Sequence, residues 1–288
     1  MGTSHRHTPT VAGEPNWGQA SAAVTSIAGA EAKLDELENE LVGNEQEGEQ
    51  QQTHSQVNPH THIAKRQQKL EGQILRNYHK AVRSLVRAAG GRAKVSSGSS
   101  RAVGHAGVVI AGGLVSAISE IVKNGLYDWL NRTGVATLEG KSCQDVLNLI
   151  RDYISAGVAG LDNTAANEAL ECVMEEIGER IGDDIEAFDA AMAVLLASND
   201  LKDMLDRFFG MYIFSHLSQN FKEKLEYDKG TEVMNETLNE IKDLILDDIH
   251  RSRDGRDTAS IDWGTEEGRA FIQQEFDRII YILSGNED

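Results

Sequence analysis

The sequence predicts an all-α fold, with a helical bundle-like body that follows a disordered amino-terminal tail. Apolar residues recur at steps of three and four through most of the chain after residue 61, which is the period of amphipathic helices. Runs of β-branched residues with a period of two, which are typical of strands, are missing. All 3 prolines lie within residues 1–59, so the remaining chain is free to form uninterrupted helices.

Charge divides the 288-residue chain into three blocks. Residues 1–60 carry 2 basic and 9 acidic side chains, residues 61–110 carry 10 basic and 1 acidic, and the whole chain has a net charge of −18. Such an acidic total argues against a protein that coats DNA or anionic membranes. We expect three parts: a mostly disordered polar and acidic tail (1–60), a basic amphipathic helix with a Gly/Ser hinge (61–100), and an acidic α-helical domain (101–288).

The tail is expected to contain a single ordered element. Residues 1–30 and 43–60 are rich in Gly, Ser, Thr, Gln and Glu. Segments of this composition bury too little apolar surface to offset the entropy of ordering, so both are expected to be disordered when alone. Leu34, Leu37 and Leu41 predict one short amphipathic helix near 31–42.

The second block predicts one long amphipathic helix. Its apolar face holds Leu70, Ile74, Tyr78, Val82 and Leu85. Its opposite face holds six cations, here called the basic stripe: Lys65, Lys69, Arg76, Lys80, Arg83 and Arg87. Gly90 and Gly91 are expected to end this helix, and Ser96–Ser100 is expected to form a hinge.

The basic stripe is the strongest internal indication of function, and three interpretations stay open. It favours contact with an acidic partner or with the acidic body of the same chain. Nucleic acid is a second possible partner, although no aromatic residues are interleaved for base stacking. Simple solvation of a charged helix face is the third.

Helix starts in the third block are expected at residues with capping side chains. Ser142 with Asp145 three residues later resembles a capping box. Asn163, Asp200 and Thr265 are expected at the starts of three further helices, and the apolar pattern from Val233 to Ile249 predicts another.

Motifs for catalysis and for metal binding are missing from the sequence. The segment that follows Gly134 has five residues between its glycines, where a phosphate-binding loop requires four. The pairs Asp183-Asp184 and Asp247-Asp248 are interpreted as solvated helix ends, and His216 and His250 as structural residues. We therefore expect a non-enzymatic protein with no catalytic residue, metal or cofactor.

The sequence also predicts a cytoplasmic location. Residues 1–30 lack the apolar region of a secretory signal, and the 2 cysteines form no disulfide framework. The longest uncharged run, 102–119, contains four glycines and is interpreted as a helix packed within the protein. No membrane partner is expected.

Several segments occur in the order found in a known family. The chain opens with Met1-Gly2-Thr3-Ser4, and Lys80–Gly91 (KAVRSLVRAAGG) precedes a Gly/Ala-rich segment at 101–118. Leu138–Leu147 (LEGKSCQDVL) and Ala169–Gly178 (ALECVMEEIG) follow. This order resembles the QatB family of the four-gene Qat anti-phage system. The resemblance implies an ATPase, a QueC-like enzyme and a TatD-like nuclease as partners.

The resemblance further implies a role for the amino terminus, where the QueC-like partner attaches a deazaguanine to Gly2. The residues suit this role, because trimming of Met1 exposes an α-amine with a pKa of about 7.7–8.0, partly neutral near pH 7.5. Glycine has no side chain to obstruct entry into a narrow active site. Thr3 and Ser4 are small hydroxyl residues that are expected to contact that site.

Overall fold

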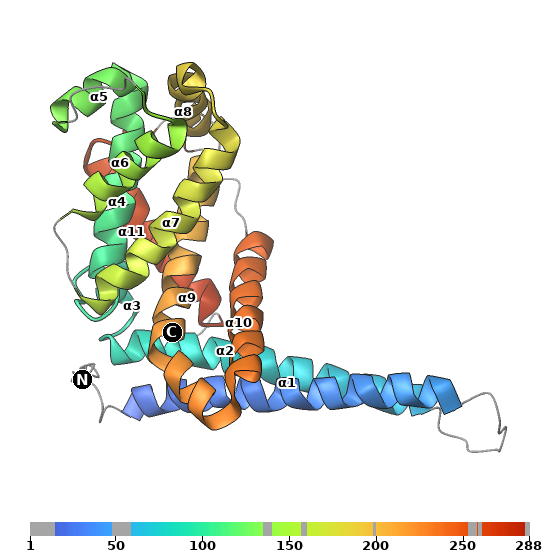
Figure 1. Cartoon of the computed structure of the whole chain (residues 1–288). Helices are drawn as coiled ribbons and strands as arrows, with labels where there is room; N and C mark the ends of the chain where they lie inside the picture. Colours follow the sequence, from blue (N-terminus) through green and yellow to red (C-terminus); the bar gives the residue numbers. More distant parts are fainter. Residues whose placement is uncertain are drawn as a thin grey trace, which may run out of the picture. The chain divides into compact units, whose positions relative to one another are not determined.

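The computed structural model describes residues 15–47, 59–134, 140–156, 160–197, 200–252, 258 and 261–285. Every regular element in these ranges is helical, which confirms the all-α prediction (Figure 1). The chain forms two compact units, here called unit 1 (Met1–Ala88 and Leu217–Leu244) and unit 2 (Ala89–His216 and Ile245–Asp288). The boundaries differ from those expected from charge, because residues 217–244 return to the unit that contains the basic helix.

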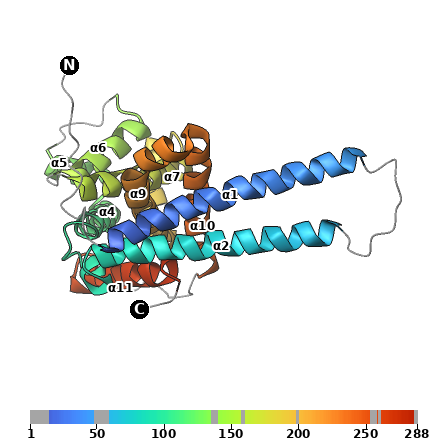
Figure 2. The ribbon, with the colours of Figure 1, turned by 90° about the horizontal axis from the view of Figure 1, so that it is seen from below.

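Unit 1 is built on two long helices, α1 (Pro15–Glu47) and α2 (Pro59–Ala88), which lie side by side (Figure 2). It also contains the end of α9 (Asp200–Lys229) and most of α10 (Thr231–Arg251). The ring of Trp17 on α1 lies 5.6 Å from that of Phe221 on α9. Nζ of Lys224 donates a 2.7 Å hydrogen bond to the Ser21 hydroxyl.

The start of α1 corrects the prediction of a tail through residue 30. The helix begins at Pro15 and contains the expected 31–42 helix as its later part. The buried face of the early part consists mostly of small side chains: Ala20, Ala23, Val24, Ile27, Ala28 and Ala30. Small side chains permit close packing of helices, and this packing offsets the ordering entropy that the composition alone does not offset. Residues 43–47 are also helical, whereas 48–58 lie outside the described residues.

Helix α2 confirms the predicted basic amphipathic helix. Ile74, Tyr78, Val82 and Leu85 are buried, and the helix ends at Ala88 before two glycines with φ angles of 101° and 96°. The expected hinge at Ser96–Ser100 is instead an ordered turn after the short helix α3 (Arg92–Ser96). The N–H groups of Ser99 and Ser100 both donate to the carbonyl of Lys94 at 3.0 Å, so backbone hydrogen bonds close this segment.

Helix α4 (His105–Asn124) packs against five other helices of unit 2. These are α5 (Leu126–Arg132), α6 (Cys143–Ser155), α7 (Leu161–Ile181), α8 (Phe188–Ala197) and α11 (Glu266–Leu283). A short 3₁₀ turn, η1 (Ile185–Ala187), precedes α8. By length and composition α4 is apolar enough to cross a membrane, with a mean hydropathy of 1.7. Core helices of folded domains have the same composition, and Ile110, Leu114 and Val115 of α4 are fully buried.

The helix starts of unit 2 lie where the sequence predicted them except at one position, and a side-chain cap is observed at Ser142 but not at Thr265. Ser142 and Asp145 form the expected capping box, with Asp145 N–H donating to the Ser142 hydroxyl at 3.2 Å. Helix α9 begins at Asp200, and Thr265 immediately precedes α11. The prediction for Asn163 is wrong, because α7 begins at Leu161 after Gly160. Gly160 has a φ of 121°, a conformation that favours glycine, and the carboxylate of Asp162 is directed to another helix.

Candidate functional site

The predicted amino-terminal site lies outside the described residues. Gly2, Thr3 and Ser4 precede Pro15, where the described structure begins. Their roles as modification acceptor and active-site contacts therefore stay predictions.

The basic stripe lies on a largely exposed face of α2. Five of its six cations are exposed, and Arg83 is half-buried. Lys65, Lys69, Arg76 and Lys80 form no ion pair with any side chain in the described ranges. The apolar face of the helix is buried and its cations face outward, as the sequence pattern predicted.

A buried carboxylate, Asp162 of α7, connects three helices of unit 2. Its Oδ1 accepts a hydrogen bond from the Tyr212 hydroxyl and lies 3.0 Å from Nε2 of His216, both on α9. Its Oδ2 accepts a 2.8 Å hydrogen bond from the N–H of Ala106 in the first turn of α4. The N–H of Gly104 donates to the Tyr212 oxygen at 2.5 Å. One carboxylate thus joins α7 to α9 and to the start of α4.

The surroundings of Asp162 and Tyr212 shift the pKa values of these two groups in opposite directions. Burial by itself raises the pKa of Asp162, but hydrogen bonds from His216, Ala106 and Tyr212 outweigh burial and hold this pKa below its ordinary value. Burial and the neighbouring Asp162 raise the pKa of Tyr212 well above its ordinary value. The carboxylate therefore stays an acceptor and the phenol a donor.

An Asp–His–Tyr set can serve catalysis, but these three side chains are enclosed by the core. The exposed fraction is 0% for Tyr212, 2% for His216 and 9% for Asp162. A general acid or base must come within hydrogen-bond reach of a substrate atom. In this arrangement the polar atoms are directed at one another and at the start of α4, so the cluster stabilises the helix arrangement.

A second buried cluster joins α9 to α11 through four charges. Nζ of Lys202 lies 2.9 Å from a carboxylate oxygen of Asp206 and 3.2 Å from one of Glu275. The Arg278 guanidinium lies 2.5 Å from each of the same two carboxylates. The Lys202, Asp206 and Glu275 side chains are at most 2% exposed, so each charge is balanced inside the core.

The two carboxylates of the second cluster titrate differently. Burial and the adjacent Glu275 raise the pKa of Asp206 to about 7. Burial also acts to raise the pKa of Glu275, but its hydrogen bonds with Asp206 and Arg278 hold this pKa below the ordinary value. The pair therefore retains a proton at a pH where isolated carboxyls are ionised.

Acidic pairs noted in the sequence lie at helix ends. Oδ1 of Asp184 accepts the N–H of Glu186 at 2.9 Å and caps η1, and Asp183 is exposed. Asp248 pairs with Arg251 at 2.8 Å on the last turn of α10. Within the described ranges, no group of three or more His, Cys, Asp or Glu residues is arranged to hold a metal ion.

Sequence reasoning did not identify the Asp162 cluster. It assigned His216 a structural role and gave Asp162 no role. A signal was present at the start of α4, because its first residues follow Gly104, which offers no capping side chain. A buried helix start without its own cap requires an acceptor from elsewhere in the chain.

The fold and these clusters define the class: an all-α protein whose buried polar groups are part of its core. A family model described as Qat anti-phage system associated protein QatB matches residues 90–283. The chain belongs to this QatB family, which confirms the resemblance seen in the sequence. The matched region includes α4–α11, whereas α1 and α2 precede it. No curated protein and no solved structure matches the chain.

Proposed function

We propose that the chain is a non-enzymatic subunit of the Qat defence complex whose Gly2 is conjugated to a deazaguanine by a QueC-like partner. Membership of the QatB family is the observation that carries this proposal. It makes the ATPase, the QueC-like enzyme and the TatD-like nuclease of the system the expected partners. The enclosed Asp162 and Asp206 clusters support a role through surfaces and termini, since neither directs an unengaged catalytic group to solvent.

The chemistry of the amino terminus suits an acyl acceptor. QueC enzymes activate a carboxylate with ATP. In the proposed step the neutral α-amine of Gly2 attacks the activated carboxyl carbon, an amide N–C bond forms, the activating group leaves, and the amine loses a proton. An α-amine with a pKa of about 7.7–8.0 is partly neutral at cellular pH. Thr3 and Ser4 would guide the terminus by hydrogen bonding in the partner's active site.

Intact mass measurement with amino-terminal peptide sequencing tests this proposal. The protein expressed beside its genomic neighbours should carry a deazaguanine-sized addition on Gly2, and the protein expressed alone should lack only Met1. Gly2→Val should abolish the addition and Thr8→Val should retain it, with the helical circular-dichroism signal unchanged in both. Equal masses in the two expression conditions would contradict the proposal.

The basic stripe supports a second candidate function, a nucleic-acid-sensing or scaffolding adaptor. The supporting observation is that four exposed cations on α2 have no ion-pair partner in the described ranges. Replacing Lys65, Lys69, Arg76 and Lys80 with Glu should abolish binding to a fluorescent duplex DNA. If the four cations contact phosphates, the wild-type dependence of log affinity on log salt should have a slope of about −4. Absence of wild-type binding at low salt would exclude nucleic-acid sensing by this stripe.

A further inference from the structure

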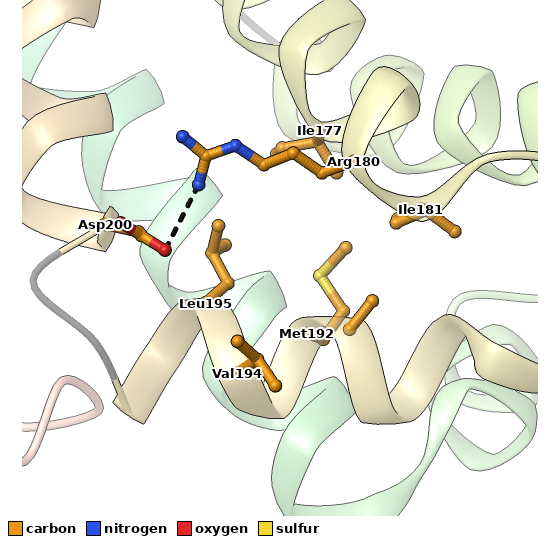
Figure 3. A pocket seen from close by; sticks show the side chains of 8 residues that line it. Ile177, Arg180, Ile181, Met192, Val194, Leu195 and Asp200 are labelled. Carbon is orange, nitrogen blue, oxygen red and sulfur yellow. Dashed lines mark ion pairs between the residues drawn. The ribbon is translucent and has the colours of Figure 1, made fainter.

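A pocket between α7 and α8 of unit 2 is lined mainly by apolar side chains. Figure 3 shows Met192 and Leu195 extending from α8 toward the helix that carries Ile177 and Ile181. The volume is about 260 Å³. Ligand pockets for drug-sized molecules are typically about 300–1,000 Å³, so this volume suits one or two amino-acid side chains better than a cofactor.

The mouth of the pocket is accessible from solvent. The Val194 side chain, which lines it, is 65% exposed, an unusual exposure for an aliphatic residue. At one side the Arg180 guanidinium lies 3.3 Å from Asp200 and 2.8 Å from Glu176 (Figure 3 draws the first pair). Glu176 also pairs with Arg207 at 2.6 Å, so two cations and two carboxylates balance one another at this side of the pocket.

The two helices that line the pocket, and the turn between them, carry several exposed carboxylates. Glu179 adjoins Arg180 in sequence, Asp183 and Asp184 follow Ile181 closely, and Asp189 precedes the lining residue Ala191. These four carboxylates belong to exposed residues and form no ion pair with any side chain that the structure describes. Two of them accept backbone hydrogen bonds at 2.9 Å, Asp184 from the N–H of Glu186 and Asp189 from the N–H of Leu126. This excess of carboxylates over cations on α7, η1 and α8 favours a cationic partner by charge complementarity.

We propose that this pocket is a docking site for a basic segment of a partner protein, which inserts one aliphatic side chain between Lys and Arg residues. The volume of the pocket matches an anchor side chain, and the exposed carboxylates of α7, η1 and α8 complement flanking cations. Unbranched, polarisable Met192 at the floor adapts to anchors of different shape. This site is independent of the proposed conjugation, because all its residues lie in unit 2 and none is in the amino terminus.

Fluorescence anisotropy with the full-length protein tests the proposal with two labelled peptides. The first is KRKALAKRK, and the second has serine in place of its leucine. The leucine peptide should bind about tenfold more tightly, because only leucine fills the pocket. Affinity for both should fall as salt rises, since the exposed carboxylates contribute by charge. Equal binding of the two peptides, or no binding of either, would overturn the proposal.

Two matched variants of α8 separate the pocket from its surroundings. Ala191→Phe fills the pocket and should lower the affinity for the leucine peptide about tenfold. Ala193→Phe, at an exposed position outside the lining, should leave this affinity unchanged. Circular dichroism establishes that both variants fold. Equal affinity of the two variants for the leucine peptide would contradict the proposal.

Val194→Asp provides a test that does not depend on how the core tolerates Ala191→Phe. It adds a negative charge at a side chain that is 65% exposed. Binding by charge alone would become tighter in this variant, whereas anchoring in the pocket predicts weaker binding. Sedimentation velocity identifies a competing occupant: wild-type dimers that Ala191→Phe dissociates would mean that a second copy fills the pocket, and would overturn the proposal of a basic partner.

Discussion

The carboxylate of Asp162 on α7 accepts the backbone N–H of Ala106 in the first turn of α4, with 2.8 Å between oxygen and nitrogen. The start of α4 has no side-chain cap of its own. The backbone N–H of Ala106 therefore finds its acceptor in a residue 56 positions later in the chain. The same residue is hydrogen-bonded to Tyr212 of α9. The stability of unit 2 should depend on this one side chain.

Replacing Asp162 with Asn should lower the free energy of unfolding by about 1–3 kcal/mol, because the amide group cannot accept all the hydrogen bonds of the carboxylate. Urea unfolding followed by circular dichroism measures the change. Asp128→Asn on an exposed position of α5 is the control, with a change within about 0.5 kcal/mol. Equal stability of the two variants would show that the cluster contributes little.

The lowered pKa of Asp162 also predicts a pH dependence. Because the folded-state pKa lies below the unfolded one, the stabilisation is present above the ordinary value near 3.9 and is lost as pH falls through the folded value. Wild type should therefore lose stability more steeply than Asp162→Asn below about pH 4. Parallel acid-unfolding curves would contradict this assignment.

Two glycines of α4 should respond in opposite ways to alanine. A Cβ at Gly107 would lie 2.7 Å from Cε1 of Tyr212, and the hydrogen bond from the Tyr212 hydroxyl to Asp162 holds this ring in place. Gly107→Ala should therefore lower the free energy of unfolding by about 1–3 kcal/mol. A Cβ at Gly112 meets nothing within 4 Å, so Gly112→Ala should stabilise by about 0.5–1 kcal/mol. Thermal unfolding compares the two, and a melting temperature that rises in both would refute the close approach of α4 and α9.

In unit 1, the raised pKa of Glu31 predicts that the stability of the folded protein decreases as pH rises. Burial and the nearby Glu240, Asp35 and Glu236 raise its pKa from 4.5 to about 7, although a hydrogen bond with Thr237 opposes this rise. The folded state therefore retains a proton that the unfolded state loses between about pH 4.5 and 7, and stability falls across that interval.

Glu31→Gln should be more stable than wild type at pH 8 by about 1–2 kcal/mol, after allowance for solvent screening of a partly exposed group, and equally stable below pH ~4.5. Glu38→Gln, at an exposed position of α1, should show no such pH-dependent difference. Urea unfolding at several pH values measures both variants. A constant difference between wild type and Glu31→Gln would exclude titration of this residue as the cause.

The charge cluster between α9 and α11 should tolerate loss of a cation poorly. At pH 8, above the raised pKa of Asp206, both carboxylates of the cluster are ionised. Lys202→Met then leaves Asp206 and Glu275 with only Arg278 from this cluster, and should lower the free energy of unfolding by about 3–5 kcal/mol. Lys222→Met, at an exposed position of α9, should change stability by less than about 0.5 kcal/mol. Guanidinium unfolding monitors both, and a small effect at Lys202 would mean that its charge is hydrated in solution.

Much of the fold could be predicted because apolar periodicity and capping are local properties. The basic helix, its end before Gly90, the Ser142 capping box and the apolar faces of α9 to α11 follow from residues within a few positions of one another. Short helices such as α3 and α5 were not predicted, since five or seven residues contain too few turns for a periodic signal. Helix α8 was missed because it is apolar on most sides.

By itself the sequence determined that the chain is helical, where most of its long helices lie, and that cations gather on one face of α2. Only the tertiary structure decided that α1 begins at Pro15, because a stripe of alanines stabilises a helix when another helix packs on it. Only the tertiary structure brought Asp162 to Tyr212 and His216, which are 50 and 54 positions away. The physical reason is the same in both cases: local patterns specify helices, whereas the partners of small and polar side chains depend on how distant helices pack.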